Sequence, residues 1–272
     1  MPWFPGSVGR VHHTAWHPVG GVRGVVVLLH GYGEHAGLYD ALGRRLAADG
    51  WAVHAMDACG HGRSDGERAV IATWDSYVDD ARQLAAIARA EHPAGPLVLA
   101  GHSGGALAAY LLALRSPSIA DALVLSAPPL RPLAWVAEEL AGETADEPAD
   151  VDPSEIFSTH PEYVHALLHD PLTWHGGFRH ETLRAVAATW PEVRAGLDGG
   201  RPDLPVLFVH GEEDPVVPLA DGLANAEQLP NASIVTFPGD LHDVLNECDR
   251  AQVHDAVARF LTTTVDVAAR AA

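Results

Sequence analysis

Lysine is absent from this chain of 272 residues, and all 17 of its basic residues are arginine. The absence excludes three chemistries that need a lysine amine, namely P-loop phosphate binding, Schiff-base catalysis and serine–lysine hydrolysis. With 36 acidic residues, the formal net charge is −19. A chain this negative is repelled by nucleic acid and by anionic membranes, and we expect neither as a partner.

Cysteine is almost as scarce. Cys59 and Cys248 are far apart in the sequence and match no zinc-site spacing, so we predict reduced thiols and no metal. The N-terminus lacks the basic start and apolar stretch of a secretory signal. Apolar runs such as residues 24–29 are much shorter than the roughly 20 residues that cross a bilayer. We therefore expect a cytoplasmic protein without an integral membrane segment.

What is present is a regular alternation of short apolar runs with longer helical patterns. This alternation predicts an α/β fold, in which helices flank a mostly parallel central sheet. The predicted strands are residues 25–30, 52–57, 97–101, 122–126, 206–210 and 233–237, and the predicted helices are residues 38–48, 75–91, 104–114, 219–228 and 250–261. Residues 6–18 are predicted to form an N-terminal hairpin or edge strand pair.

The alternation breaks between residues 128 and 200, where no strand-like run occurs. This stretch contains amphipathic pieces at 132–141, 161–169 and 181–197 and an acidic loop at 142–152. The sheet pattern resumes at Pro205. We therefore predict a helical cap, residues 128–200, inserted into an α/β-hydrolase core made of residues 1–127 and 201–272.

The candidate nucleophile is Ser103, in the stretch Gly101-His102-Ser103-Gly104-Gly105. This is a G-x-S-x-G motif between a predicted buried strand and an alanine-rich helix, the context in which a sharp strand-to-helix turn exposes the serine hydroxyl. The alternative is a structural glycine-rich turn. The context favours a nucleophile.

A serine nucleophile needs hydrogen-bond donors for the charge that develops on the carbonyl oxygen. One donor is expected from the backbone N–H of Gly104. The second is expected from Tyr32, which follows His30-Gly31 at the end of an earlier strand. The alternative is an ordinary glycine-rich strand exit, and His30, on the wrong strand for a catalytic base, is interpreted as structural.

The acid of such a triad follows the nucleophile in the chain and stands at the end of a later strand. Asp214 comes after the predicted strand at 206–210 and just before two prolines that stiffen its loop. Glu212 and Glu213 are its rivals.

The base comes last, after the strand at 233–237. His242 is the only histidine between that strand and the last helix, and His254 inside the helix is predicted to be a surface residue. Asp240 and Asp243 could orient His242 locally, although sequence neighbours rarely have the right geometry. We predict a catalytic triad of Ser103, Asp214 and His242.

With these motifs in place, the chain resembles the monoacylglycerol lipase and lysophospholipase-like branch of the α/β-hydrolases, which are serine hydrolases. The resemblance rests on HGYGEHAGLYDAL, DACGHGRSDG, GHSGG, HDPLTWHGG, VHGEEDPVVP and LHDVLNE, in order along nearly the whole chain. It implies the same triad, an oxyanion hole of Tyr32 and Gly104, and a helical cap at 128–200. It also implies hydrolysis of long-chain acyl esters without metal or cofactor.

The sequence departs from that family at three places. Gly104 replaces a methionine whose side chain lines the acyl pocket, and Cys59 replaces an arginine-type residue. The predicted cap, apolar in lipid-active members, carries seven acidic residues: Glu138, Glu139, Glu143, Asp146, Glu147, Asp150 and Asp152. These charges disfavour membrane docking.

Apolar residues of the predicted cap are candidates for substrate binding. Leu130, Leu133, Trp135 and Val136, with Leu140, would either line a pocket for the acyl tail or form the core of the cap.

The leading hypothesis is a serine carboxylester hydrolase that acts on a small-molecule acyl ester, such as a monoacylglycerol, through an acyl-enzyme intermediate. Alternatives that keep the triad are an acyltransferase, a thioesterase and an esterase of soluble short-chain esters. A non-catalytic ligand-binding relative is a further alternative. None of these motifs specifies the acyl-chain length of the substrate, its alcohol part or the oligomeric state of the protein.

Overall fold

The structure is a computed structural model that describes residues 2–142 and 152–265. Within these residues eight strands form one sheet in the order β1-β2-β4-β3-β5-β6-β7-β8. The strands are β1 Trp3–Gly6, β2 Gly9–Trp16, β3 Gly24–Leu29, β4 Trp51–Met56, β5 Leu97–His102, β6 Ala122–Ser126, β7 Val206–Gly211 and β8 Ala232–Phe237. From β4 to β8 neighbouring strands are parallel, and β1 and β2 extend the sheet antiparallel. The predicted α/β-hydrolase fold is confirmed.

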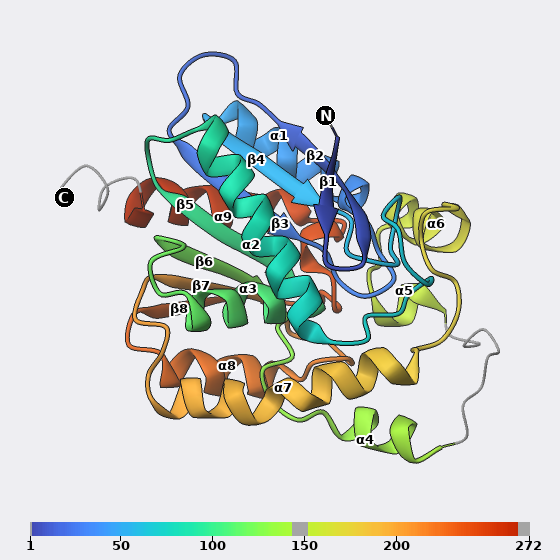
Figure 1. Cartoon of the computed structure of the whole chain (residues 1–272). Helices are drawn as coiled ribbons and strands as arrows, with labels where there is room; N and C mark the ends of the chain where they lie inside the picture. The colour runs from blue at the N-terminus through green and yellow to red at the C-terminus, as the bar shows by residue number, and fades with distance from the viewer. Residues whose placement is uncertain (1, 143–151, 266–272) are drawn as a thin grey trace.

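Helices cover both faces of this sheet (Figure 1). They are η1 Ala36–Tyr39, α1 Asp40–Ala48, α2 Trp74–Glu91, α3 Gly104–Arg115, α4 Ala134–Ala141, α5 Pro153–Ile156, α6 Pro161–His169, α7 His180–Asp198, α8 Leu219–Gln228, η2 Val244–Asn246, α9 Arg250–Phe260 and the π-helical turn η3 Leu261–Val265. The larger apolar core lies between the sheet and helices α2 and α3. A second core lies on the opposite face, against α1 and α9.

Most predicted strands and helices end within one or two residues of the observed ones, because the buried parallel strands are apolar throughout. The predicted N-terminal strand pair is present, but it begins at Trp3 rather than at residue 6, because Gly6 pairs with Gly9 across the turn. Helix α5 was not predicted, because four residues are too few to show a helical period. No helix in the described part of the chain is long and apolar enough to cross a membrane.

Residues 128–200, the predicted cap, contain α4 to α7. Helix α7 packs against α2, α3 and α8, whereas α5 and α6 lie beyond the carboxyl ends of the strands (Figure 1). Of the seven acidic residues expected there, the exposed Glu138, Glu139 and Asp152 belong to the described structure. The other four, Glu143, Asp146, Glu147 and Asp150, lie outside the described residues.

Candidate active site

Ser103 occupies the sharp turn between β5 and α3, with φ 49° and ψ −119°. A non-glycine residue rarely adopts a positive φ, and such strain is characteristic of functional sites. A Cβ atom on Gly101 would lie 2.4 Å from the carbonyl carbon of Gly105, and one on Gly105 would lie 2.2 Å from the carbonyl oxygen of Leu29. The turn therefore needs glycine on both sides of Ser103.

The structure brings Ser103, His242 and Asp214 together at the carboxyl edge of the sheet. The Nε2 atom of His242 lies 2.9 Å from Ser103 Oγ, and its Nδ1 lies 2.8 Å from Asp214 Oδ2. His242 is 2% exposed and the side chain of Asp214 is fully buried. In this arrangement Nδ1–H donates to the carboxylate, and Nε2 is free to accept the hydroxyl proton of Ser103.

The carboxylate of Asp214 is stabilised in its charged form. Its Oδ1 accepts hydrogen bonds from the N–H groups of Val216 at 2.8 Å and Val217 at 2.9 Å, and His210 Nε2 lies 3.3 Å from Oδ2. Burial alone would raise the pKa of Asp214, but His242, His210 and the backbone donors hold it well below its usual value. Asp214 therefore stays ionised and fixes the orientation of the imidazole.

The rivals of Asp214 are directed elsewhere. Glu212 and Glu213 are both exposed, and Glu212 Oε1 accepts a hydrogen bond from Thr236 at the sheet edge. Of the two aspartates near His242, Asp243 hydrogen-bonds other side chains and not the imidazole.

The prediction that His254 is a surface residue was wrong. It is 5% exposed, and its Nε2 donates to the carbonyl oxygen of Leu245 at 2.9 Å. A buried histidine whose ring nitrogen donates to a backbone carbonyl packs as a core residue. The periodicity of α9, which also buries Val253 and Val257, is the sequence signal that would have indicated this.

The two expected oxyanion donors lie on loops that meet beside Ser103. A Cβ atom built on Gly104 would lie 4.0 Å from the backbone nitrogen of Tyr32. His30, interpreted as structural, is buried, and its Nε2 accepts a hydrogen bond from the N–H of Ala58 at 2.9 Å. Burial, reinforced by His61, lowers the pKa of His30 to about 3, so its ring is neutral. His30 therefore links the loop after β3 to the backbone of Ala58 after β4.

The side chain of Tyr32 is anchored in the predicted cap. Its hydroxyl donates to the carbonyl oxygen of Gly177 at 3.1 Å and accepts from the N–H of Arg179 at 2.9 Å, and its ring stacks on Phe178 at 4.9 Å. Burial raises the pKa of this phenol to about 12, so it is un-ionised at neutral pH. The backbone of Tyr32 is thereby held between β3 and the cap residues.

A mainly apolar cavity of about 570 Å³ opens above Ser103. Leu133, Trp135 and Val136 line it, and the buried Leu133 and Val136 also belong to a small apolar cluster with Leu183 and Val217. Leu130 does not line it, which corrects the prediction: it precedes α4 and is buried in the larger core under the sheet. Further apolar lining comes from Ile156, Phe157, Leu167, Leu168, Trp174, Phe178, Leu183, Val186, Val216 and Val217.

Trp74 fills the space beside Gly104, which sequence reasoning missed. A Cβ atom on Gly104 would lie 3.1 and 3.2 Å from the indole ring of Trp74, the first residue of α2. The indole therefore packs where the side chain of a larger residue after Ser103 would begin. A tryptophan at a helix start carries no sequence signal for this contact.

Sequence reasoning also missed Glu34, whose buried carboxyl group lies against the loop that carries Tyr32. Its Oε2 accepts hydrogen bonds from the N–H of Gly31 at 2.7 Å and from the hydroxyl of Tyr39 at 2.6 Å. Its Oε1 contacts the hydroxyl of Tyr163, which also lies 2.6 Å from Asp243 Oδ2. Glu34 therefore joins the loop before Tyr32 to helix α6.

This arrangement requires one shared proton. The Tyr163 hydroxyl has a single proton but contacts one oxygen of Glu34 and one of Asp243. One of these two carboxyl groups must therefore be protonated and donate to the hydroxyl oxygen. Burial and the charge of Asp243 raise the pKa of Glu34 to about 8. Burial opposes ionisation of Asp243 too, but His102 and the hydrogen bonds from Tyr163 and Asn246 lower its pKa. Glu34 is therefore the protonated member of the pair at neutral pH.

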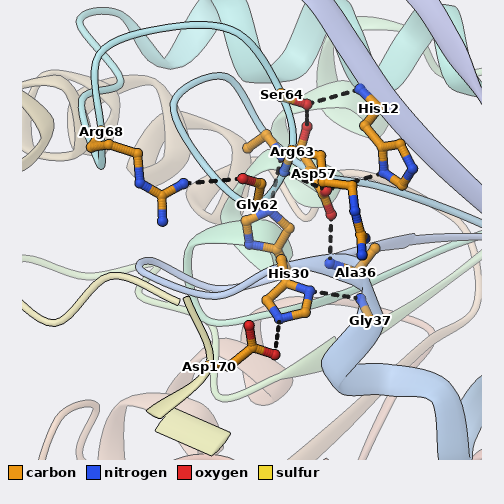
Figure 2. A network of polar contacts seen from close by, with 12 residues as sticks. His12, His30, Ala36, Gly37, Asp57, Gly62, Arg63, Ser64, Arg68 and Asp170 are labelled. Atoms are coloured by element: carbon orange, nitrogen blue, oxygen red, sulfur yellow. Dashed lines mark hydrogen bonds and ion pairs between the residues drawn. The ribbon is translucent and has the colours of Figure 1, made fainter. Parts of the chain in front are cut away.

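A second polar network holds the same loop from the opposite side. Asp57, after β4, accepts hydrogen bonds at 2.9 Å from the N–H groups of Ala36 and Arg63 (Figure 2). Asp170, from the loop after α6, contacts His35 Nε2 at 3.2 Å. The segment that carries Tyr32 is thus fixed by the core and by the predicted cap together.

Comparison with known proteins agrees with this geometry. Residues 20–249 match the model of a hydrolase family described as serine aminopeptidase, S33. The chain belongs to this family. The hydrolase is 33% identical over 273 residues to the monoacylglycerol lipase of Mycolicibacterium smegmatis, a match that covers 96% of each chain. It is 33% identical to the monoglyceride lipase homolog of monkeypox virus, over 92% of each chain.

Among solved structures, the hydrolase superposes on the monoacylglycerol lipase of Paleococcus ferrophilus with a TM-score of 0.77 and 25% identity. That match covers 93% of this chain and 98% of the other. The predicted resemblance to monoacylglycerol lipases is confirmed, and the hydrolase is an ester hydrolase of the α/β-hydrolase class.

Proposed function

We propose that this hydrolase cleaves acyl esters of the monoacylglycerol type, with Ser103 as nucleophile, His242 as general base and Asp214 as its orienting acid. The observation that carries the proposal is the unbroken contact from Asp214 through the two nitrogens of His242 to Ser103. The similarity to monoacylglycerol lipases supports the substrate class. The apolar cavity supports it too, since its volume lies within the roughly 300–1,000 Å³ of small-molecule sites.

In the first half of the reaction, Ser103 Oγ attacks the ester carbonyl carbon while its proton passes to His242 Nε2. The negative charge that forms on the carbonyl oxygen accepts hydrogen bonds from the N–H groups of Tyr32 and Gly104. The bond to the alcohol then breaks, and His242 returns the proton to the departing glycerol oxygen. Ser103 is left as an ester of the fatty acid.

In the second half, a water molecule gives a proton to His242 Nε2 and attacks the acyl carbon. The carbon–Oγ bond breaks, Ser103 regains its proton from His242, and the fatty acid leaves. Throughout, the ionised Asp214 stabilises the protonated imidazole.

A neutral head group suits this chain better than a charged one. The net charge of −19 repels anionic phosphate-bearing substrates as they approach. Between monoacylglycerols and lysophospholipids with an anionic head group, electrostatics therefore favours the uncharged glycerol esters.

The test compares kcat/KM for monoacylglycerols of increasing chain length with kcat/KM for p-nitrophenyl esters of the same acids. The proposal predicts that medium and long chains are preferred and that Ser103→Ala abolishes both reactions. A preference for acetyl or butyryl esters would overturn the monoacylglycerol assignment and leave an esterase of soluble esters. Ester products in place of fatty acid, with glycerol or methanol added, would instead identify an acyltransferase.

A further inference from the structure

Histidine rings gather where helix α2 ends against the sheet. His54 belongs to β4, Glu91 and His92 end α2, and His17 follows β2. The ring centroids of His17, His54 and His92 are separated from one another by 5.8 to 5.9 Å. The three rings are steeply inclined to one another, at 53° to 88°, so they are not a stack.

Three ring nitrogens of His54 and His92 are buried without a hydrogen-bond partner among the described residues. His54 is 1% exposed, and neither Nδ1 nor Nε2 has a hydrogen-bond partner among the residues that the structure describes. The same holds for Nε2 of His92. Buried polar atoms normally have a partner, because leaving one unpaired costs free energy. These nitrogens therefore call for a ligand that the protein itself does not supply.

We propose that His54, Glu91 and His92 bind a divalent transition-metal ion of the Zn²⁺ type. One ligating atom from each residue lies within 4.8 Å of the other two, and Glu91 Oε2 is 3.9 Å from His54 Nε2. In a tetrahedral zinc site, bonds of about 2.0–2.1 Å place neighbouring ligand atoms about 3.3 Å apart. Since Glu91 is exposed and His92 caps the helix end, both can move inward by the small distance required. The exposed His17 lies beside these three residues, with its ring centroid 5.8 Å from the rings of both His54 and His92.

The donor set determines the kind of ion. Imidazole nitrogens with one carboxylate suit zinc, nickel and copper, whereas calcium and magnesium prefer oxygen ligands. Metal binding needs a neutral imidazole.

A second cluster of metal-ligating residues shows the contrast. Glu34, His102 and Asp243 also lie within 4.8 Å of one another. There, hydrogen bonds from Tyr39 and Tyr163 already occupy the carboxyl oxygens of Glu34, and Tyr163 also bonds Asp243. The His54 cluster has three buried ring nitrogens without a hydrogen-bond partner among the described residues, whereas the second cluster has one such buried atom, Asp243 Oδ1.

The proposed metal site is separate from the hydrolase site. Helix α2 begins at Trp74 in the active-site cavity and ends at Glu91, and its 18 residues span about 27 Å at 1.5 Å each. An ion bound there would join the end of α2 to β4. The ion would stabilise the fold. The proposal of this site does not depend on the reaction at Ser103.

The experiment is calorimetric titration of untagged, EDTA-treated full-length protein with ZnCl₂, and with CaCl₂ for comparison. We expect one saturable Zn²⁺ site per chain, no Ca²⁺ binding and a zinc-dependent rise in Tm. Because His54→Phe can fail to fold, the exposed Glu91→Gln and the helix-end His92→Gln are tested beside it. Removing one ligand should weaken the affinity at least about tenfold. Co²⁺ bound at the same site should show the visible absorption of tetrahedral coordination.

The matched control is the double substitution His165→Gln and His169→Gln, which removes a histidine pair on α6 whose rings lie 4.4 Å apart. This control should keep the Zn²⁺ affinity of the unaltered protein. The proposal is overturned if the binding of Zn²⁺ does not saturate, which would mean that water molecules are the hydrogen-bond partners of the buried nitrogens. It is equally overturned if Glu91→Gln and His92→Gln bind Zn²⁺ as tightly as the unaltered chain.

Discussion

Replacing Glu34 by glutamine tests the proton that the structure assigns to this buried carboxyl group. Glutamine has the shape of the neutral acid, so its carbonyl oxygen can still accept from Gly31 and Tyr39. Its amide can donate to Tyr163, as the protonated carboxyl does. The difference is that glutamine cannot ionise.

The magnitude follows from proton linkage. The native pKa of Glu34, about 8, lies above its ordinary value of 4.5. Below pH 4.5 the group is protonated in both states and has no pH-dependent effect. As the pH rises from 4.5 towards 8, the unfolded chain releases the proton and the native chain retains it. The stability of the native protein therefore falls by about 1.4 kcal/mol per pH unit through this group. Between pH 6 and 8 the loss is about 2 kcal/mol.

The assay is urea denaturation of the unaltered protein and the Glu34→Gln variant at pH 6, 7 and 8. All other titrating groups contribute equally to both proteins, so the difference in unfolding free energy isolates Glu34. That difference should shift in favour of glutamine by about 2 kcal/mol from pH 6 to pH 8. Glu34→Ala is the control, because it destabilises at every pH by leaving the Gly31 and Tyr39 donors unpaired. A difference for Glu34→Gln that is constant with pH would show that Glu34 is ionised in the native state.

Three further substitutions have defined outcomes. Asp214→Asn should lower kcat by about 10³–10⁴-fold with little change in KM, because the imidazole loses its orienting charge; a loss below tenfold in p-nitrophenyl ester hydrolysis would contradict the assignment. Gly104→Met should overlap Trp74 and lower kcat/KM about tenfold, and Trp74→Ala in the same chain should recover part of it. If the double variant is no better than the single, Trp74 is not the obstruction. Leu130→Ala should lower the free energy of unfolding by about 2–5 kcal/mol, measured by heat or urea, and leave the acyl-chain preference unchanged. A changed preference would show that Leu130 contributes to the pocket.

The parts of the fold that the sequence predicts are those with strong local patterns. Strands β3, β5 and β7 are apolar in nearly every position because they are buried on both faces. Each is followed at its carboxyl end by one of the chemically distinctive segments, around Tyr32, Ser103 and Asp214. Parallel strands place these segments at one edge. Chain order predicts Asp214 and His242, and the structure brings both side chains into contact with each other and His242 into contact with Ser103.

The features that were missed depend on contacts between segments far apart in the chain. Trp74 reaches Gly104 across 30 positions, and Glu34 reaches Tyr163 across 129. Neither pair has a spacing or a motif that marks it. Leu130 and Val136 illustrate the same limit, since both are apolar residues of the predicted cap. Only their packing shows that Val136 reaches the cavity and Leu130 does not.

The central claim is that Ser103 is a nucleophile activated by His242, and fluorophosphonate labelling tests it most directly. The account predicts one adduct per chain, mapped by peptide mass spectrometry to Ser103, with ester hydrolysis lost in proportion to labelling. Ser103→Ala should not be labelled, and His242→Ala should be labelled far more slowly, because the hydroxyl keeps its proton. Labelling at another residue, or full ester hydrolysis by the Ser103→Ala protein, would contradict the claim.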